Sequence, residues 1–268
     1  MLFLFQSGTR DVSSDDIIGE QLENTIRMLT GTQDTALHGG VKVPFLTAKE
    51  EHFRTAYQAA QQHKPDILLL LQYGRNFSVG LIEATVQGIK DNMQVVVPFI
   101  ELNAAERIPP KFLEGVIGTT DWAWNIPYKY RYNRGIEFVE NYAAKYQRYP
   151  SWGAATVYTI LHEYKSAVER AQSFAVADVV RALEGHAFSL LKNRQLWRDF
   201  DHQSVQSVFI IRGNREEDVF KDKFRMDFFE VLGSVPGDHI SLTRQQWEEI
   251  RKAEGLPAYL EALPEENR

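Results

Sequence analysis

The first 118 residues of the chain alternate short apolar runs with segments in which apolar side chains recur at helical spacing. We expect β-strands at the apolar runs, which are Leu2–Phe5, Val41–Leu46, Ile67–Leu71, Met93–Ile100 and Gly115–Thr120. We expect helices between the first four runs, namely from Ser14 or Asp15 to Met28, over Glu50–Gln62 and over Phe77–Lys90. Strands separated by helices predict a right-handed, doubly wound α/β fold with a parallel sheet.

The pattern changes after Glu114 and becomes mainly helical from Arg131 to Gly185. The helices expected there are Gly135–Tyr146, Gly153–Ala171 and Val176–Leu183. Two strand patterns separated by a charged turn follow, and two short helices close the chain: Val205–Ile211, Met226–Leu232, Thr243–Ala253 and Pro257–Ala262. A helical stretch between two sheet-forming stretches indicates a piece of a second lobe whose own strands are missing.

Side chains able to hold a ligand follow the two central apolar runs. Gln72 and Tyr73 come directly after the first run, and Phe99 and Glu101 lie at the end of the second. In an open parallel sheet, ligands bind outside the carboxyl ends of the strands. We expect the hydroxyl of Tyr73 and the carboxylate of Glu101 to lie at this edge of the sheet, which predicts a small polar ligand.

Composition narrows the classes of partner. A net charge of −6 argues against nucleic acid or an anionic membrane as a partner, because both require a basic face. No apolar run approaches the roughly 20 residues that cross a bilayer, so we expect no stable membrane insertion. The start, MLFLFQSGTRD, lacks the basic first residues and the apolar length that an export signal needs. The absence of cysteine excludes disulfides and thiolate nucleophiles.

The candidate catalytic and metal motifs are incomplete. Asp201-His202-Gln203 has no nucleophile elbow to serve, so we interpret it as a hydrogen-bonding turn. His162-Glu163 lacks the second histidine of a zinc helix. Neither a Walker loop nor a G-x-G-x-x-G loop is present. The sequence therefore predicts no enzymatic activity, no metal and no cofactor.

Three stretches, in order, resemble the type I periplasmic binding proteins, the substrate-binding components of ABC importers of the branched-chain amino-acid (leucine/isoleucine/valine-binding) group. They are KPDILLLLQYG at 64–74, AAKYQRYPSWGAAT at 143–156 and DFDHQSVQSVFII at 199–211. The resemblance extends roughly from Val41 to Leu232. It implies two α/β lobes, joined by three crossovers, that close on a small ligand.

The resemblance also implies a division of the chain. Residues 1–118 correspond to an α/β ligand-binding lobe, and 119–204 to the helical part of the other, incomplete lobe. Residues 205–268 are expected to return to the first lobe with a hairpin and C-terminal helices. The family's N-terminal half, with its export signal, has no counterpart, so we expect either a truncated product or a true start upstream of Met1. The implied location is periplasmic, or cytoplasmic if Met1 is the true start.

The resemblance further suggests roles for five side chains. Tyr73 lies where the family places a ligand-facing aromatic ring, and Glu101 near a carboxylate that pairs with a ligand ammonium. Phe99 is expected to form an apolar wall, with Gln72 as a neighbour and Trp122 near a hinge crossing. The alternatives are a tyrosine that only packs, a glutamate in a solvated loop and a tryptophan that only covers the surface.

The implied function is the substrate-binding component of an ABC importer, which binds an amino acid or a similar carboxylate-bearing solute and presents it to an ABC permease. One alternative is a ligand-sensing, regulatory domain of the same fold. Another is a truncated fragment that binds nothing. The sequence gives neither the ligand's identity nor the oligomeric state.

Overall fold

The structure, a computed structural model, describes residues 2–7, 14–34, 39–44 and 47–260, with side chains described from residue 21 onward. The chain divides into two compact units. Unit 1 consists of Met1–Thr120 and Ile210–Glu230, and unit 2 of Asp121–Phe209 and Val231–Arg268. The backbone therefore passes from one unit to the other three times, as the family resemblance implies.

Unit 1 is built on a seven-stranded sheet with the order β10-β9-β5-β4-β3-β1-β2. Its strands are β1 (Leu2–Ser7), β2 (Gly40–Pro44), β3 (Ile67–Leu71), β4 (Gln94–Val97), β5 (Ile117–Thr120), β9 (Val208–Gly213) and β10 (Phe229–Val235). The pairs formed among β1 to β5 are parallel. The order 2-1-3-4-5 confirms the doubly wound α/β fold. The last residues of the expected strand Val41–Leu46, Phe45 and Leu46, lie outside the described part.

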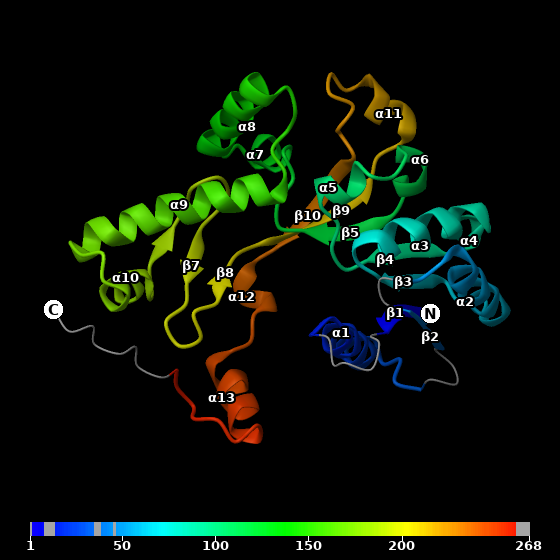
Figure 1. Ribbon diagram of the computed structural model, residues 1–268, viewed down its shortest axis with the longest axis horizontal. Helices are drawn as coiled ribbons and strands as arrows, with labels where there is room; N and C mark the ends of the chain where they lie inside the picture. The colour runs from blue at the N-terminus through cyan, green and yellow to red at the C-terminus, as the bar shows by residue number, and fades with distance from the viewer. Residues whose placement is uncertain (1, 8–13, 35–38, 45–46, 261–268) are drawn as a thin grey trace. The chain divides into compact units, whose positions relative to one another are not determined.

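Helices connect these strands (Figure 1). They are α1 (Ser14–Thr30), α2 (Glu50–His63), α3 (Gly74–Val86), α4 (Ile89–Asn92), α5 (Leu102–Ala105), α6 (Pro110–Leu113) and α11 (Glu216–Lys221). The single helix expected over 77–90 is divided, because Gly88 takes the left-handed conformation with φ +68° and ends α3. The strand expected to reach Ile100 ends at Val97, before Pro98, which has no N–H for the ladder.

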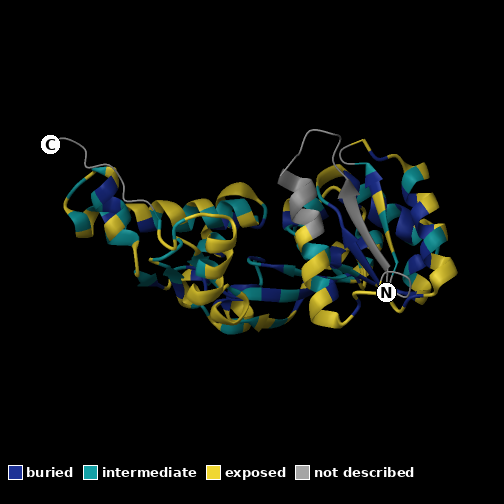
Figure 2. Cartoon of the chain, turned by 90° about the horizontal axis from the view of Figure 1, so that it is seen from below, coloured by how far each residue is buried: buried dark blue, intermediate teal, exposed yellow. Residues whose placement is uncertain are grey.

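Strand β3 forms the centre of the unit 1 core. Because side chains alternate along a strand, Leu69 and Leu71 face one side of the sheet and pack against Leu22 and Ile26 of α1. On the other side, Leu70 lies against α3. Four consecutive leucines are buried, which explains the unbroken apolar run. Figure 2 shows buried residues in dark blue on strands of the sheet and on the helices beside it.

Helices α2 and α3 pack closely on that second face. A Cβ added at Gly80 of α3 would lie 2.8 Å from Cε1 of Phe53 in α2, so only glycine allows this approach. The hydroxyl of Tyr57, also in α2, donates to the carbonyl of Gly80 at 2.7 Å. This packing positions α3, which is separated from the end of β3 by Gln72 and Tyr73.

Unit 2 is mainly helical, as the sequence predicts. Its helices are α7 (Ile126–Tyr130), α8 (Asn133–Tyr146), α9 (Trp152–Ala171), α10 (Val176–Leu183), α12 (Gly237–Ile240) and α13 (Arg244–Ala253). Ser151 caps α9 by accepting from the amide of Ala154 at 3.4 Å. A small antiparallel sheet was not predicted, and its strands are β6 (Ala187–Phe188), β7 (Gln195–Trp197) and β8 (Ser204–Val205).

The C-terminal part differs from the expected return of 205–268 to the first lobe. Only Ile210–Glu230 groups with unit 1, and the chain after Glu230 belongs to unit 2. A Cβ at Gly237 would lie 2.5 Å from the carbonyl oxygen of Gln206, so the chain after β10 is packed against the backbone before β9. The second helix expected at the C-terminus is not formed over its described part, 257–260.

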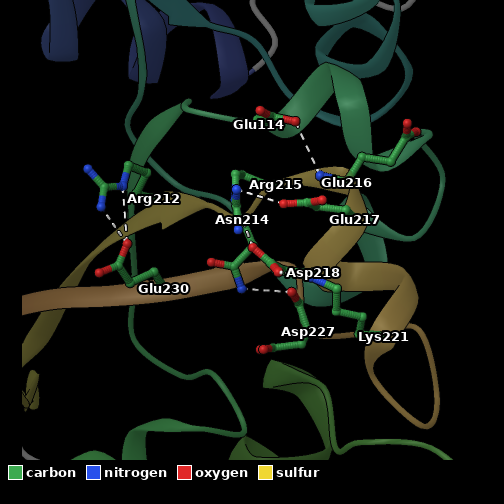
Figure 3. A network of polar contacts seen from close by, with 10 residues as sticks. All are labelled: Glu114, Arg212, Asn214, Arg215, Glu216, Glu217, Asp218, Lys221, Asp227 and Glu230. Atoms are coloured by element: carbon green, nitrogen blue, oxygen red, sulfur yellow. Dashed lines mark hydrogen bonds and ion pairs between the residues drawn. The ribbon is translucent and has the colours of Figure 1, made fainter.

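The charged segment between β9 and β10 contains helix α11 instead of a simple turn, and polar contacts hold it in place (Figure 3). Glu114 accepts from the amide of Glu216 at 3.2 Å, and Arg212 pairs with Glu230 at 2.6 Å. Asn214 donates to the backbone carbonyl of Asp227 at 2.8 Å. Oδ1 of Asp227 is buried and has no partner among the described residues.

Asp227 makes the stability of the protein depend on pH. Burial raises the pKa of its carboxyl to about 6, and the nearby Asp222 and Asp218 add to the rise. The unfolded chain releases this proton near pH 4, so the folded state is penalised as pH rises from about 4 to 6. Allowing for solvent screening, Asp227→Asn should raise the free energy of unfolding by roughly 1 to 2 kcal/mol at pH 7 and change little near pH 4.

Urea unfolding at the two pH values measures this difference. The exposed Asp238 offers a matched control, because Asp238→Asn should change neither value appreciably. Equal effects of Asp227→Asn at pH 4 and pH 7 would show that the carboxyl is not the source of the penalty.

Candidate functional site

A pocket of about 220 Å³ lies in unit 1 at the carboxyl ends of β3 and β4. Its lining residues come from the segment after β3 and from the segment after β4: Gln72, Tyr73, Gly74, Phe77, Ser78, Phe99, Glu101, Ala104 and Arg107. Four of the five side chains predicted from the sequence therefore meet in one cavity. This is the edge of the sheet at which ligands bind in open α/β folds.

The turn from β3 into α3 forms one wall. Tyr73 has extended backbone (φ −128°, ψ 161°) and is the N-cap residue of α3, but its side chain does not cap the helix. The next residue, Gly74, has φ +54°, a conformation that glycine adopts without strain. The first two turns of α3 then place Phe77 and Ser78 on the pocket. The start of a helix favours an acceptor or an anion nearby, because its first N–H groups have no partner within the helix.

The connection after β4 forms the opposite wall and carries two opposite charges. Glu101 is the N-cap residue of α5, and its Oε2 accepts from the amide of Asn103 at 2.8 Å. Oε1 makes no hydrogen bond within the described part of the chain. Arg107, which follows α5, also lines the pocket and has no ion-pair partner among the described residues. Sequence reasoning missed Arg107, although a basic residue six positions after Glu101 in the same connection was a usable signal.

Gln72 is the most buried polar residue of the pocket. It is 1% exposed, and neither Nε2 nor Oε1 of its side chain has a hydrogen-bond partner among the described residues. Buried amides are nearly always paired in folded proteins. Both amide atoms of Gln72 are closed to solvent, so the amide is buried beside the pocket without a partner among the described residues.

Trp122, the fifth predicted residue, belongs to unit 2 and lines a separate pocket of about 280 Å³. Trp122 is 4% exposed, its Nε1 donates to the carbonyl of Pro150 at 3.2 Å, and its ring packs edge-on against Phe138. The same pocket contains Lys192, which donates to the backbone carbonyl of Asp121. Burial lowers the pKa of this lysine to about 8.

The remaining candidate motifs have structural partners. Asp201 accepts from Arg198 and from the amide of Gln203 at 3.1 Å, which confirms the predicted hydrogen-bonding turn. Glu163 accepts from His186 at 2.9 Å and from the indole of Trp197 at 3.1 Å. Among the described residues, no group of three or more acidic or histidine side chains is placed to hold a metal ion. Within that same part, no helix is long and apolar enough to cross a membrane.

Comparison of the sequence with known protein families identifies the family of this chain. The sequence profile described as "Periplasmic binding protein" matches residues 12–218, which is more than half of the chain. The chain belongs to the periplasmic binding protein family. This confirms the resemblance inferred from the three sequence stretches. Among proteins of curated function, none matches the chain.

Solved structures of periplasmic binding proteins share this fold. An amino acid ABC transporter substrate-binding protein from Pseudomonas fluorescens is 22% identical with a TM-score of 0.71, and the match covers 90% of this chain and 60% of that one. A branched-chain amino acid ABC transporter ligand-binding protein from Burkholderia xenovorans is 17% identical, with a TM-score of 0.73 and coverages of 91% and 61%. A solute-binding protein of an ABC transporter from Rhodopseudomonas palustris, in complex with 3,4-dihydroxybenzoic acid, is 13% identical, with a TM-score of 0.63 and coverages of 88% and 60%.

The chain thus spans about 60% of the length of these periplasmic binding proteins. The family and its structural neighbours are solute-binding proteins, not enzymes. Members of the family bind small molecules and work with ABC transporters, and the family suggests a periplasmic location.

Proposed function

We propose that the chain is the substrate-binding component of an ABC importer and takes an amino acid or a similar carboxylate-bearing solute. The observation that carries the proposal is the pocket at the carboxyl ends of β3 and β4, where an acid and a base meet aromatic rings. Small-molecule sites are concave and largely apolar, with a few polar groups that fix the orientation of the ligand. This pocket has that composition.

The charges of the pocket complement those of a free amino acid. Oε1 of Glu101 is available to accept from an ammonium group, and the guanidinium of Arg107 to donate to a carboxylate. Tyr73, Phe77 and Phe99 supply surfaces for an aliphatic or aromatic body. The names of the three neighbours agree with this class, since amino acids and dihydroxybenzoic acid all carry a carboxyl group.

The connectivity of the chain supports a hinge mechanism in which the protein changes between an open and a closed conformation. Three chain crossings join the units, which is the arrangement of a hinged binding protein. A ligand shifts such an equilibrium only as far as its affinities for the open and the closed form differ. We propose that the ligand-bound, closed form is the one that an ABC permease recognises.

Glu101→Gln tests the ligand role directly. We expect the variant to weaken the binding of free amino acids by roughly 10-fold or more, because a charge-assisted bond to the ammonium is replaced by a neutral one. Binding of the matching carboxylic acids without an amino group, such as isovalerate in place of leucine, should change little. Calorimetric titration of the full chain measures both.

Two further variants complete this test. Arg107→Gln should weaken the binding of amino acids and of simple carboxylates alike, because both kinds of ligand present a carboxylate. Glu50→Gln, an exposed change in α2, serves as the matched control and should leave all affinities unchanged. Unaltered amino-acid binding by Glu101→Gln would remove Glu101 from the ligand site. If no amino acid and no simple carboxylate bound to the unmodified chain, the proposed function would be overturned.

A further inference from the structure

The three chain crossings between the units each have one residue at the boundary of unit 2. These residues are Asp121, Phe209 and Val231. Asp121 directly follows β5, Phe209 lies in β9 and Val231 lies in β10. The three strands are neighbours in the sheet, in the order β10-β9-β5 (Figure 1). Any bending between the units has to take place in these three segments, because no other part of the chain joins the units.

Lys192 contacts two of the three crossings. It lies in the turn between β6 and β7 and is 7% exposed. Its Nζ donates to the backbone carbonyl of Asp121 and lies 5.6 Å from the centroid of the Phe209 ring, within the range of a cation–π interaction. With its pKa of about 8, most of this side chain is protonated at pH 7. One buried cation therefore joins the first and the second crossing.

Lys129, in α7, contacts the third crossing. Its Nζ donates to the backbone carbonyl of Val231. The next residue, Tyr130, has its ring 5.7 Å from the ring of Phe209, measured between centroids. Two short segments of unit 2 therefore contact all three residues at which the chain enters or leaves this unit.

The two segments that carry the lysines are packed against the same point of α8. A Cβ at Gly135 of α8 would lie 2.1 Å from the carbonyl oxygen of Leu191 and 2.8 Å from Cγ of Pro127 in α7. The turn between β6 and β7 is also joined to the segment before β9, because Nδ2 of Asn193 donates to Oγ of Ser207 at 2.6 Å. The lysines thus contact the crossings from closely packed parts of unit 2.

These contacts restrict where the chain can bend. A hydrogen bond from an ammonium group is stronger than one between neutral groups, and a buried lysine that loses its partner is costly. Hinge motion is absorbed by a few residues whose backbone angles change. Where a crossing is held at its unit 2 end, the freedom that remains lies on the side of unit 1.

We propose that Lys192 and Lys129 are positioning residues of the hinge, which hold the unit 2 ends of the three crossings so that opening and closing bend the chain on the unit 1 side of these contacts. The proposal rests on the hinge mechanism of the proposed function and adds the residues that determine where the hinge bends.

Hydrogen–deuterium exchange of the ligand-free full chain, followed by mass spectrometry, reports on each crossing separately. Lys192→Met and Lys129→Met remove the ammonium group and keep most of the length of the side chain. In Lys192→Met, the amides of 119–123 and 207–211 should exchange roughly 10-fold or more faster, because local opening no longer breaks a hydrogen bond from a charged group. In Lys129→Met, only the amides of 229–233 should change by this amount, so each variant is a control for the other.

The mobility of the hinge is measured by the distance between the units. The chain contains no cysteine, so Gln58→Cys in α2 and Asn141→Cys in α8 provide two exposed sites for spin labels, one in each unit. The distribution of distances between the two labels should become broader when either lysine is replaced, because the crossings then bend over longer segments. Lys165→Met, an exposed change in α9, is the matched control and should alter neither the exchange nor the distances.

Each outcome decides the role of the lysines. Faster exchange spread over the whole of unit 2 would show that they support the folding of this unit, and it would overturn the proposal. Unchanged exchange at the crossings, or a distance distribution as narrow as that of the unmodified chain, would also overturn it. Neither measurement uses a ligand. If both results are as expected and no amino acid or simple carboxylate binds, the proposed function falls and the role of the lysines stands.

Discussion

Replacing Gly213 by alanine is expected to destabilise the protein by about 3 kcal/mol or more, because the added methyl group has no space that a side-chain movement can create. Gly213 ends β9 where it meets the segment leading into β5. Its amide donates to the carbonyl of Val116 at 2.9 Å, and its carbonyl accepts from the amide of Gly115 at 3.0 Å. A Cβ would lie 1.9 Å from the carbonyl oxygen of Leu113 at the end of α6, so the backbone of β9 or of α6 has to move and these hydrogen bonds have to lengthen.

The neighbouring strand provides the control. Gly233 lies in β10, and a Cβ there would meet nothing within 4 Å. Gly233→Ala should therefore be neutral or slightly stabilising, since alanine restricts the unfolded chain more than glycine does. Guanidinium-induced unfolding of both variants gives the comparison. A difference of less than 0.5 kcal/mol between them, as an order of magnitude, would contradict the close approach of β9 to the Leu113 backbone.

Phe53→Ala should be the second large effect, with a loss of about 3 to 5 kcal/mol in the free energy of unfolding. The ring of Phe53 is fully buried, contacts the position of Gly80 in α3 and lies 6.2 Å from the ring of Tyr57, measured between centroids. Truncation leaves a cavity between α2 and α3. Gly80, which faces this space from α3, has no side chain that could fill it. Because α3 carries the pocket residues Phe77 and Ser78, ligand affinity should fall as well.

An exposed position on the same helix separates packing from helix propensity. Gln58→Ala in α2 should have almost no effect on stability or on ligand affinity, because its side chain faces solvent. Thermal and urea unfolding report the stability, and calorimetry reports the affinity. If Phe53→Ala unfolded like Gln58→Ala, the contact between α2 and α3 would not contribute to the core.

The fold of unit 1 was predictable because its signals are long and regular. The run Ile67–Leu71 is apolar at every position, and β3 is covered on both faces, by α1 on one side and by α2 and α3 on the other. Signals of two or three residues are too short for periodicity to reveal, which is why β6, β7 and β8 were missed. The break at Gly88 was missed because a glycine near a helix end fits both continuation and termination.

Four residues of the candidate site could be predicted from the sequence by one simple rule. The rule that ligands bind at the carboxyl ends of strands brought together Gln72, Tyr73, Phe99 and Glu101, whose ligand roles stay predictions. It does not extend past the short helix α5 to Arg107. It also gave no sign that Glu101 caps α5, because serine, threonine, aspartate and asparagine are the usual N-cap residues. The position of Trp122 depends on the packing of unit 2, which strand-end reasoning does not address.

The three chain crossings also determine the order in which neighbouring strands of the sheet are synthesised. Strand β5 is made before residues 121–207, whereas β9, its neighbour in the finished sheet, leaves the ribosome only after those residues. During this interval the outer edge of β5 has unpaired N–H and C=O groups, which are a template for association with other chains. The strand has only four residues, and a short edge of this kind limits the exposure of the nascent protein until translation of β9 covers it.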